Sequence, residues 1–144
     1  MYHYSKSSLL FLESCHPDLQ RLAHELIKHR DVRILEGHRR KELQDKYYHD
    51  GTSKTPWPKS KHNASPSLAV DMIPYPTPYW AWRPETPEQK KTAWSFWCEW
   101  GSWVRGVADT MGIKIRWGYD WDRDRDLHDQ TFYDGPHFEL LGGV

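Results

Sequence analysis

The sequence predicts a single α+β domain spanning residues 1–144, and two observations support this prediction. First, apolar residues recur with the 3.6-residue period of amphipathic helices over 17–30 and 86–112, whereas four other apolar runs have the length of short strands. Second, the expected helices and strands do not alternate regularly, which is typical of α+β folds rather than of parallel α/β sheets. The sequence has no internal repeat and no linker to a second domain, so we expect one compact domain with an aromatic core.

The first predicted helix follows Pro17, because proline is favoured in the first turn of a helix. Its apolar stripe consists of Leu19, Leu22, Ala23, Leu26 and Ile27. A short strand is expected next, over 32–35, followed by a second helix over 39–48 with Leu43 and Tyr47 on its inner face.

The middle of the chain is expected to contain one buried strand, over 68–73, between two irregular segments. The stretch 50–67 is rich in Gly, Pro, Ser, Thr and Lys and is therefore expected to be a loop. Five prolines in 74–87 exclude a helix or a central strand there. Trp80 and Trp82 lie in this second segment, and we expect them to contact a glycan or a peptide or to cover the edge of the core.

The longest helix begins at a capping box formed by Thr86 and Gln89. Its apolar stripe consists of Ala93, Trp97, Trp100, Val104, Val107 and Met111. The helical spacing of its tryptophans indicates core packing rather than a sugar-binding surface. Gly112 ends the helix, and two further strands are expected over 113–117 and 137–141.

The formal net charge is zero, with 20 basic and 20 acidic residues, which argues against a cationic nucleic-acid or membrane-surface binder. The charge is unevenly distributed, because residues 119–144 carry a net charge of −5. Cys15 and Cys98 are expected to be reduced thiols. We expect neither a transmembrane helix nor a secretory signal, since the apolar run 9–12 is short and precedes Glu13, so synthesis in a cytosol is predicted.

Two places in the sequence combine histidine with a carboxylate beside an expected strand. His62 lies in a loop, and Asp71 follows nine residues later in an apolar strand, where an unpaired charge would be costly. A turn at Asp134 leads to His137. Two histidines and one aspartate form a common ligand set for catalytic Zn²⁺, for which Asp134 would act as general base. Alternatively, Asp71 is a capping residue or pairs with an arginine such as Arg39, His62 is an ordinary loop residue and Asp134 only opens a turn.

The segment 120–129 is an acidic loop with carboxylates at every second position, which is the spacing of the first ligands in a calcium loop. The candidate Ca²⁺ ligands are Asp120, Asp122, Asp124 and Asp126. The loop is not an EF-hand, because Arg125 occupies the position of the obligatory glycine and Thr131 that of the final glutamate. A Ca²⁺ site, a loop neutralised by its own arginines and a substrate-facing loop are the three interpretations.

Four blocks of sequence resemble a known family when they are taken together and in order. The blocks are Ile34-Leu35-Glu36-Gly37-His38-Arg39 with Gln44, Ser60-Lys61-His62 to Ala69-Val70-Asp71, Arg116-Trp117-Gly118-Tyr119-Asp120-Trp121-Asp122, and Phe132-Tyr133-Asp134-Gly135-Pro136-His137-Phe138-Glu139-Leu140. The chain is similar to the LAS zinc metallopeptidases, related to VanY-type D-Ala-D-Ala carboxypeptidases, and among them to phage endolysins that are L-alanyl-D-glutamate peptidases. The resemblance implies a small antiparallel sheet that carries the zinc site and packs against three main helices.

The resemblance also implies roles for individual residues. The implied zinc ligands are His62, Asp71 and His137, and the implied acid/base is Asp134. Arg39 matches an arginine that steadies the substrate carbonyl or the developing oxyanion, and Ser60 a serine that supports a ligand or contacts substrate. The spacing from His62 to Asp71 is two residues longer than is usual in the family, which affects loop shape and substrate fit more than metal binding.

The function implied by the resemblance is that of a zinc-dependent endolysin that cleaves the L-Ala-D-Glu bond of the peptidoglycan stem peptide. Such a protein would act as a monomer, without a separate wall-binding domain. It would reach the periplasm from the host cytoplasm after a holin-like protein has permeabilised the membrane. The alternatives are a D,D-carboxypeptidase that removes terminal D-Ala, a non-catalytic zinc-stabilised cell-wall binding domain, and an aromatic binder of single-stranded nucleic acid.

Overall fold

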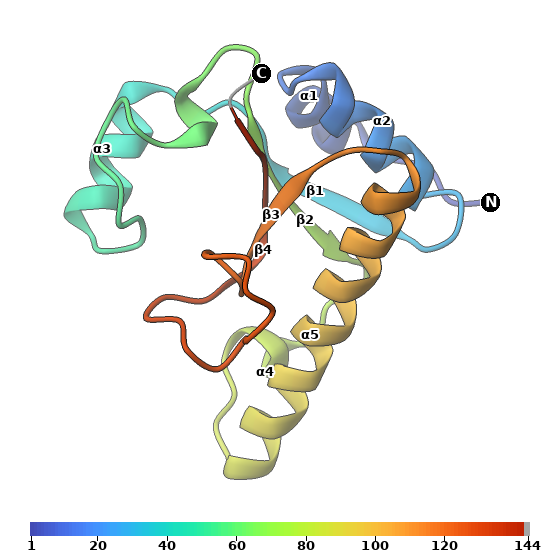
Figure 1. Cartoon of the computed structure of the whole chain (residues 1–144), viewed down its shortest axis with the longest axis vertical. Helices are drawn as coiled ribbons and strands as arrows, with labels where there is room; N and C mark the ends of the chain where they lie inside the picture. Colours follow the sequence, from blue (N-terminus) through green and yellow to red (C-terminus); the bar gives the residue numbers. More distant parts are fainter. Residues whose placement is uncertain (143–144) are drawn as a thin grey trace.

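The structure is a computed structural model that describes residues 1–142, and its centre is a four-stranded antiparallel sheet (Figure 1). In the order β1-β2-β4-β3, the strands are β1 (Val32–Glu36), β2 (Ala69–Pro74), β4 (Asp134–Leu140) and β3 (Ile115–Gly118). The helices are α1 (Lys6–Glu13), α2 (Pro17–Leu26), α3 (Lys41–His49), α4 (Tyr79–Trp82) and α5 (Pro87–Thr110), together with the short 3₁₀ helix η1 (Lys61–Asn63). The predicted α+β class is confirmed.

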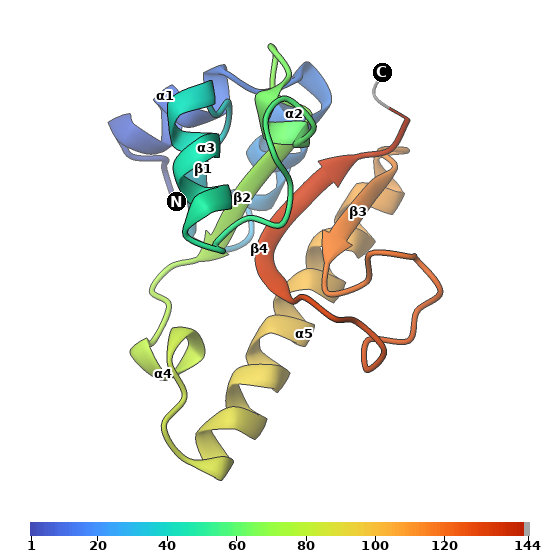
Figure 2. The same cartoon turned by 90° about the vertical axis from the view of Figure 1, so that its left-hand side faces the viewer.

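The sheet lies between two groups of elements. The helices α1, α2 and α5 lie on one side of it, whereas α3 and the loop that leads to η1 lie on the other (Figures 1 and 2). The core lies on the α5 side, where Trp100 and Phe138 are fully buried. The indole nitrogen of Trp100 donates a hydrogen bond to the Met72 carbonyl at 3.1 Å, which ties α5 to β2. Because neighbouring residues on a strand point to opposite faces, Asp71 and His137 lie on the other face of the sheet.

Three helical segments, α1, α4 and η1, are absent from the sequence-based prediction. The inner face of α1 consists of Ser8 and Leu12, which is too little apolar surface to produce a helical pattern. The expectation that 74–87 contains no helix is wrong, because α4 forms one turn after Pro78 and its prolines lie outside that turn. No helix among residues 1–142 is both long enough and apolar enough to cross a membrane.

Two further differences from prediction concern the polar side of the sheet. In α3 the buried residue is Gln44, whereas Leu43, which the apolar pattern predicts to face inward, is 37% exposed. The strand β4 begins at Asp134, three residues before the expected strand, so Asp134 lies on the strand rather than in a turn. Hydrophobic periodicity does not report the burial of polar side chains, which explains both differences.

The register of the sheet brings polar residues of three strands together. Asp71 of β2 is paired with His137 of β4 on one side and with Glu36 of β1 on the other. The β1 pairing contains an irregularity between Ile34 and Glu36. Since residues directly opposite each other in an antiparallel pair point to the same face, Asp71 and His137 are neighbours on the polar face.

Candidate active site

The structure brings His62, Asp71 and His137 together as a group that has the geometry of a metal site. His62 Nε2, Asp71 Oδ1 and His137 Nδ1 form a triangle in which all three distances are 3.2 Å. A tetrahedral ion with bonds of about 2.0–2.1 Å would place its ligand atoms about 3.3 Å apart. The triangle therefore fits a small tetrahedral metal ion with two nitrogen ligands and one oxygen ligand, and it leaves a fourth position for another ligand.

The second nitrogen of each histidine fixes the orientation of the ring. His62 Nδ1 donates a hydrogen bond to the Gly37 carbonyl at 2.7 Å, so Nε2 carries the lone pair. His137 Nε2 donates to Glu139 Oε1 at 2.8 Å, so in the neutral ring Nδ1 carries the lone pair. Glu139 is itself held by Arg116, whose guanidinium donates to Oε2 at 2.7 Å. When both rings are neutral, these tautomers direct three lone pairs at one point, which is the arrangement that a metal cation requires.

Burial and neighbouring charges oppose each other in this group. Burial raises the pKa of Asp71, but the adjacent His62 and His137 outweigh burial and hold that pKa well below its usual range. Burial lowers the pKa of His137, but hydrogen bonds to Asp71 and Glu139 outweigh burial and raise the pKa to about 10. The buried carboxylates therefore attract a positive charge to this position, which either a proton or a metal ion can supply.

Asp134 lies at the start of β4, where its backbone is closely packed on both sides. A side chain at Gly118, its partner on β3, would overlap the Asp134 carbonyl oxygen, and one at Gly135 would overlap the indole of Trp97. Burial, and then the negative charge of Asp71, raise the pKa of Asp134 to about 6. A carboxylate with a pKa in this range can accept and return a proton near neutral pH.

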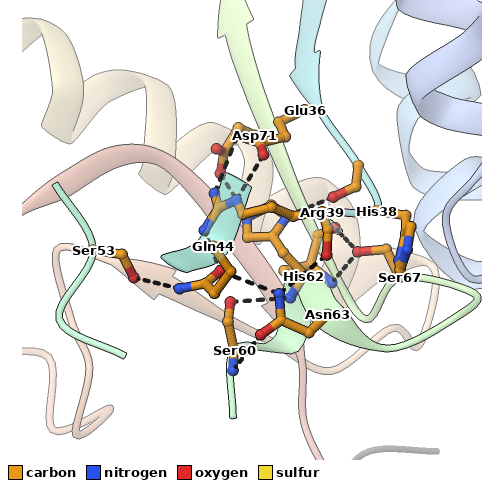
Figure 3. A network of polar contacts seen from close by, with 12 residues as sticks. Glu36, His38, Arg39, Gln44, Ser53, Ser60, His62, Asn63, Ser67 and Asp71 are labelled. Carbon is orange, nitrogen blue, oxygen red and sulfur yellow. Dashed lines mark hydrogen bonds and ion pairs between the residues drawn. The ribbon is translucent and has the colours of Figure 1, made fainter. Parts of the chain in front are cut away.

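Arg39 lies beside the metal group, and its guanidinium is fixed by Glu36 and Gln44 (Figure 3). Nε and Nη2 donate to the two carboxylate oxygens of Glu36 at 2.6 and 3.1 Å, and Nη1 donates to Gln44 Oε1 at 2.9 Å. The ion-pair partner of Arg39 in the described part of the chain is thus Glu36 and not Asp71, contrary to the alternative interpretation. These bonds use three of the five N–H donors of the guanidinium. No residue among 1–142 accepts from the other two, so both can donate to an oxygen of a substrate.

Ser60 caps η1, the short helix that carries His62. Its hydroxyl accepts a hydrogen bond from the His62 backbone N–H at 3.2 Å, and its own N–H donates to Asn63 Oδ1 at 3.1 Å. The Asn63 amide donates to the Arg39 carbonyl and to Gln44 Oε1, both at 3.1 Å. The Ser60 cap therefore positions a metal-ligand candidate, and the same network reaches the backbone of Arg39 (Figure 3).

The candidate site opens into one cavity of about 780 Å³. The predicted site residues in its wall are Arg39, Ser60, His62, Asp71, Asp134 and His137. The cavity is within the usual size range of ligand sites, about 300–1,000 Å³, and it is large enough for part of a peptide. Its other walls include polar residues of 52–55 and the aromatic side chains of Trp82, Trp121 and Phe132.

Asn63 and Glu139 also belong to the site, although the sequence patterns do not single them out. Each has a signal that is visible in the sequence. Asn63 is three residues after Ser60, which is the spacing of a capping box. Glu139 is two residues after His137 on one strand, and that spacing places both side chains on the same face.

The acidic loop contains a second group of carboxylates. Ligand atoms of Asp120, Asp122 and Asp124 lie within 4.8 Å of one another, and Asp126 is outside this group. Asp120 is buried and forms an ion pair with Arg105 at 3.0 Å, so one of the three charges is already compensated. The Ca²⁺ interpretation of this loop stays a prediction.

Comparisons with known proteins agree on one family. The chain matches the model of the family described as phage L-alanyl-D-glutamate peptidase over residues 1–141. It is 29% identical over 146 residues to the L-alanyl-D-glutamate peptidase of Escherichia phage T5, which covers 97% of this chain and 98% of that protein. It is also similar to the crystal structure of the L-Ala D-Glu endopeptidase ChiX of Serratia marcescens, with a TM-score of 0.68, 26% identity and coverage of 97% of this chain and 90% of that one. The protein therefore belongs to the family of phage L-alanyl-D-glutamate peptidases.

Proposed function

We propose that the protein hydrolyses the L-Ala-D-Glu bond of the peptidoglycan stem peptide with the help of a zinc ion bound by His62, Asp71 and His137. The observation that carries the proposal is the 3.2 Å triangle of ligand atoms in a cavity that Asp134 also lines. Two imidazole nitrogens and one carboxylate favour zinc over magnesium or calcium, which prefer oxygen ligands. The membership of the chain in a peptidase family supports the enzyme over the non-catalytic binding domain.

The proposed mechanism divides the work between three groups. Zinc, when bound, supplies a Lewis acid that activates water and polarises a carbonyl group. Asp134 takes the proton of the attacking water, since a pKa of about 6 leaves its carboxylate ionised at neutral pH. The same group then returns the proton to the departing amine of D-Glu. Arg39, which is fixed by Glu36, directs its remaining N–H donors at the carbonyl oxygen as negative charge develops there.

The substitution Asp134→Asn tests this assignment. Asparagine has nearly the same size but cannot take up the proton, so kcat should fall about 10²–10⁴-fold, the usual contribution of general acid–base catalysis. The zinc content of the purified variant should remain that of the wild type, because Asp134 is not part of the ligand triangle. Lysis of purified cell walls and metal analysis measure the two quantities.

The matched control is Asp109→Asn at the exposed end of α5, which should keep full activity. Retained lysis by the Asp134 variant would contradict the proposed role of this residue. Mass spectrometry of the digested muropeptides identifies the bond that is cut. A product split between L-Ala and D-Glu supports the proposal, whereas released D-Ala would indicate a D,D-carboxypeptidase.

The proposal includes a route to the substrate. The protein would be made in the host cytoplasm, act as a monomer and reach the cell wall in the periplasm after a separate holin-like protein has permeabilised the membrane. The phage family supports this route. Expression in a bacterial host should cause lysis only when such a protein is co-expressed, and sedimentation should give the mass of one chain.

A further inference from the structure

A second cavity, of about 370 Å³, adjoins the catalytic cavity. The two share Trp82, Asp134 and Pro136 in their walls, so the second cavity lies directly beside the site of the proposed chemistry. It lies between α4, α5 and the start of β4, and Figure 1 shows α4 beside α5. Its volume is within the range of small-molecule sites, about 300–1,000 Å³.

Five aromatic rings line this cavity, together with small, proline and charged residues. The rings are those of Trp82, Trp94, Trp97, Tyr119 and Tyr133. We call it the aromatic cavity. Trp82 is the most accessible of the tryptophans, with 44% of its surface exposed, whereas Trp97 is buried. Trp97 holds Trp82 in position. Its Nε1 donates a hydrogen bond to the carbonyl of the neighbouring residue Ala81 at 2.8 Å, and its ring meets that of Trp82 edge to face at 5.0 Å.

Trp80 and Trp82 are both candidates from the sequence for contact with a glycan or peptide, and the structure separates them. The ring of Trp80 packs edge to face against Phe96 at 5.8 Å, and this tryptophan covers the core. Trp82 instead lines both cavities. The accessible indole therefore lies where a ligand that extends out of the catalytic cavity would pass.

The chemistry of the substrate places a sugar close to the bond that is cut. In peptidoglycan the amino group of L-Ala is joined to the lactyl group of N-acetylmuramic acid. The L-Ala-D-Glu bond is therefore one residue away from the sugar. At about 3.3–3.6 Å per extended residue, the lactyl group lies within about 7 Å of the carbonyl that is attacked. An enzyme that cuts this bond in the cell wall must accommodate the sugar beside its catalytic residues.

We propose that the aromatic cavity binds the N-acetylmuramyl residue that carries the stem peptide, with Trp82 as a specificity-determining residue. This inference rests on the proposed function. The C–H face of a pyranose ring and the methyl of an N-acetyl group pack well on aromatic rings, whereas other walls of the catalytic cavity, such as 52–55, are polar. Asp134 lines both cavities, so a sugar in the aromatic cavity would lie close to the residue that transfers the proton.

The test compares two soluble substrates that differ only in the sugar. One is an N-acetylmuramyl pentapeptide, and the other is the same pentapeptide with a simple acetyl group on L-Ala. The wild type should cleave the muramyl substrate with a higher kcat/KM, by about tenfold, which is the size of one good aromatic contact. Trp82→Ala should remove most of this preference, and Trp82→Tyr should retain most of it.

The matched control is Tyr79→Ala. Tyr79 is on the same short helix and is 65% exposed, but it lines neither cavity, so its loss should leave the preference unchanged. Zinc content and thermal unfolding establish that each variant is folded. If Trp82→Ala does not fold, the preference of the wild type and of Trp82→Tyr still decides the question.

Equal kcat/KM values of the wild type for the two substrates would overturn the sugar site and leave the proposed function intact. An equal loss on both substrates in folded Trp82→Ala would overturn it as well. Cleavage of neither substrate between L-Ala and D-Glu would contradict the proposed function itself, and the sugar site with it.

Discussion

Glu139 accepts hydrogen bonds from His137 at 2.8 Å and from Arg116 at 2.7 Å, and through His137 it acts on the metal-ligand triangle. A carboxylate in this position holds the imidazole tautomer and increases the electron density on Nδ1. Glu139→Gln keeps the size of the side chain but removes its charge. We expect zinc affinity to fall about 10–100-fold, the usual effect of such partners, which competition with a chromophoric chelator measures.

Glu99→Gln is the control for this prediction, because Glu99 lies on α5 in an exposed ion pair with Arg30. It should leave zinc affinity unchanged. If Glu139→Gln also bound zinc like the wild type, the contact would be structural and the tautomer would be fixed by other means.

The candidate site was predictable where a residue is chemically unusual for its position. Asp71 interrupts an apolar strand, and a charge there needs a partner. Residues that act through others carry a weaker signal, since Glu139 on a strand and Asn63 in a loop are ordinary in type. The buried network of Gln44 depends on contacts between α3 and η1, which no local pattern reports.

At the scale of elements, prediction succeeded where one face is apolar over several turns or one strand. The stripes of α2 and α5 and the run in β2 satisfy this condition. It failed for α1, whose inner face includes Ser8, and for the beginning of β4. In β4 the sequence Asp134-Gly135-Pro136 has the composition of a turn, but β3 pairs with it through Gly118 and makes it a strand.

The pairing of β3 with β4 leads to a prediction about Gly118. Gly118→Ala places a methyl group on the backbone of Asp134, which cannot move away as a flexible side chain would. We expect the free energy of unfolding to fall by about 1–3 kcal/mol, as in other overpacked positions, and activity to fall because Asp134 is displaced. Urea unfolding and cell-wall lysis measure the two effects.

Gly106→Ala provides the matched control. Gly106 is an exposed helical glycine of α5 with no atom near its missing Cβ, so alanine should raise the free energy of unfolding by about 0.5–1 kcal/mol. Similar stability changes in the two variants would show that β3 and β4 can separate at this point without cost.

At the scale of the whole molecule, the uneven charge is explained by the position of the acidic residues. Of the acids in 119–144, Asp134 and Glu139 belong to the candidate site and Asp120 is paired with Arg105. Exposed residues of the loop carry the rest. The net charge of −5 thus includes carboxylates that would lie beside a dication, which the formal count omits.

The metal-ligand triangle joins η1, β2 and β4, and His62 and His137 are 75 residues apart. Binding of zinc to the native protein alone should therefore stabilise the fold, by about 2.7 kcal/mol at a free concentration of 100 times Kd. For a domain of this size we expect Tm to rise by about 5–10 °C on addition of zinc and to return on chelation. Calorimetry with and without chelator measures the change, and His62→Ala should abolish it.

The same experiment separates a catalytic metal from a structural one. The apolar core, with Trp100 and Phe138, lies on the opposite face of the sheet from the triangle. Its burial therefore does not depend on the metal ion. The chelated protein should therefore keep its cooperative transition and its near-ultraviolet circular dichroism at 25 °C while losing activity. Unfolding on chelation would instead favour the zinc-stabilised binding domain, because a structural zinc supplies the folding energy itself.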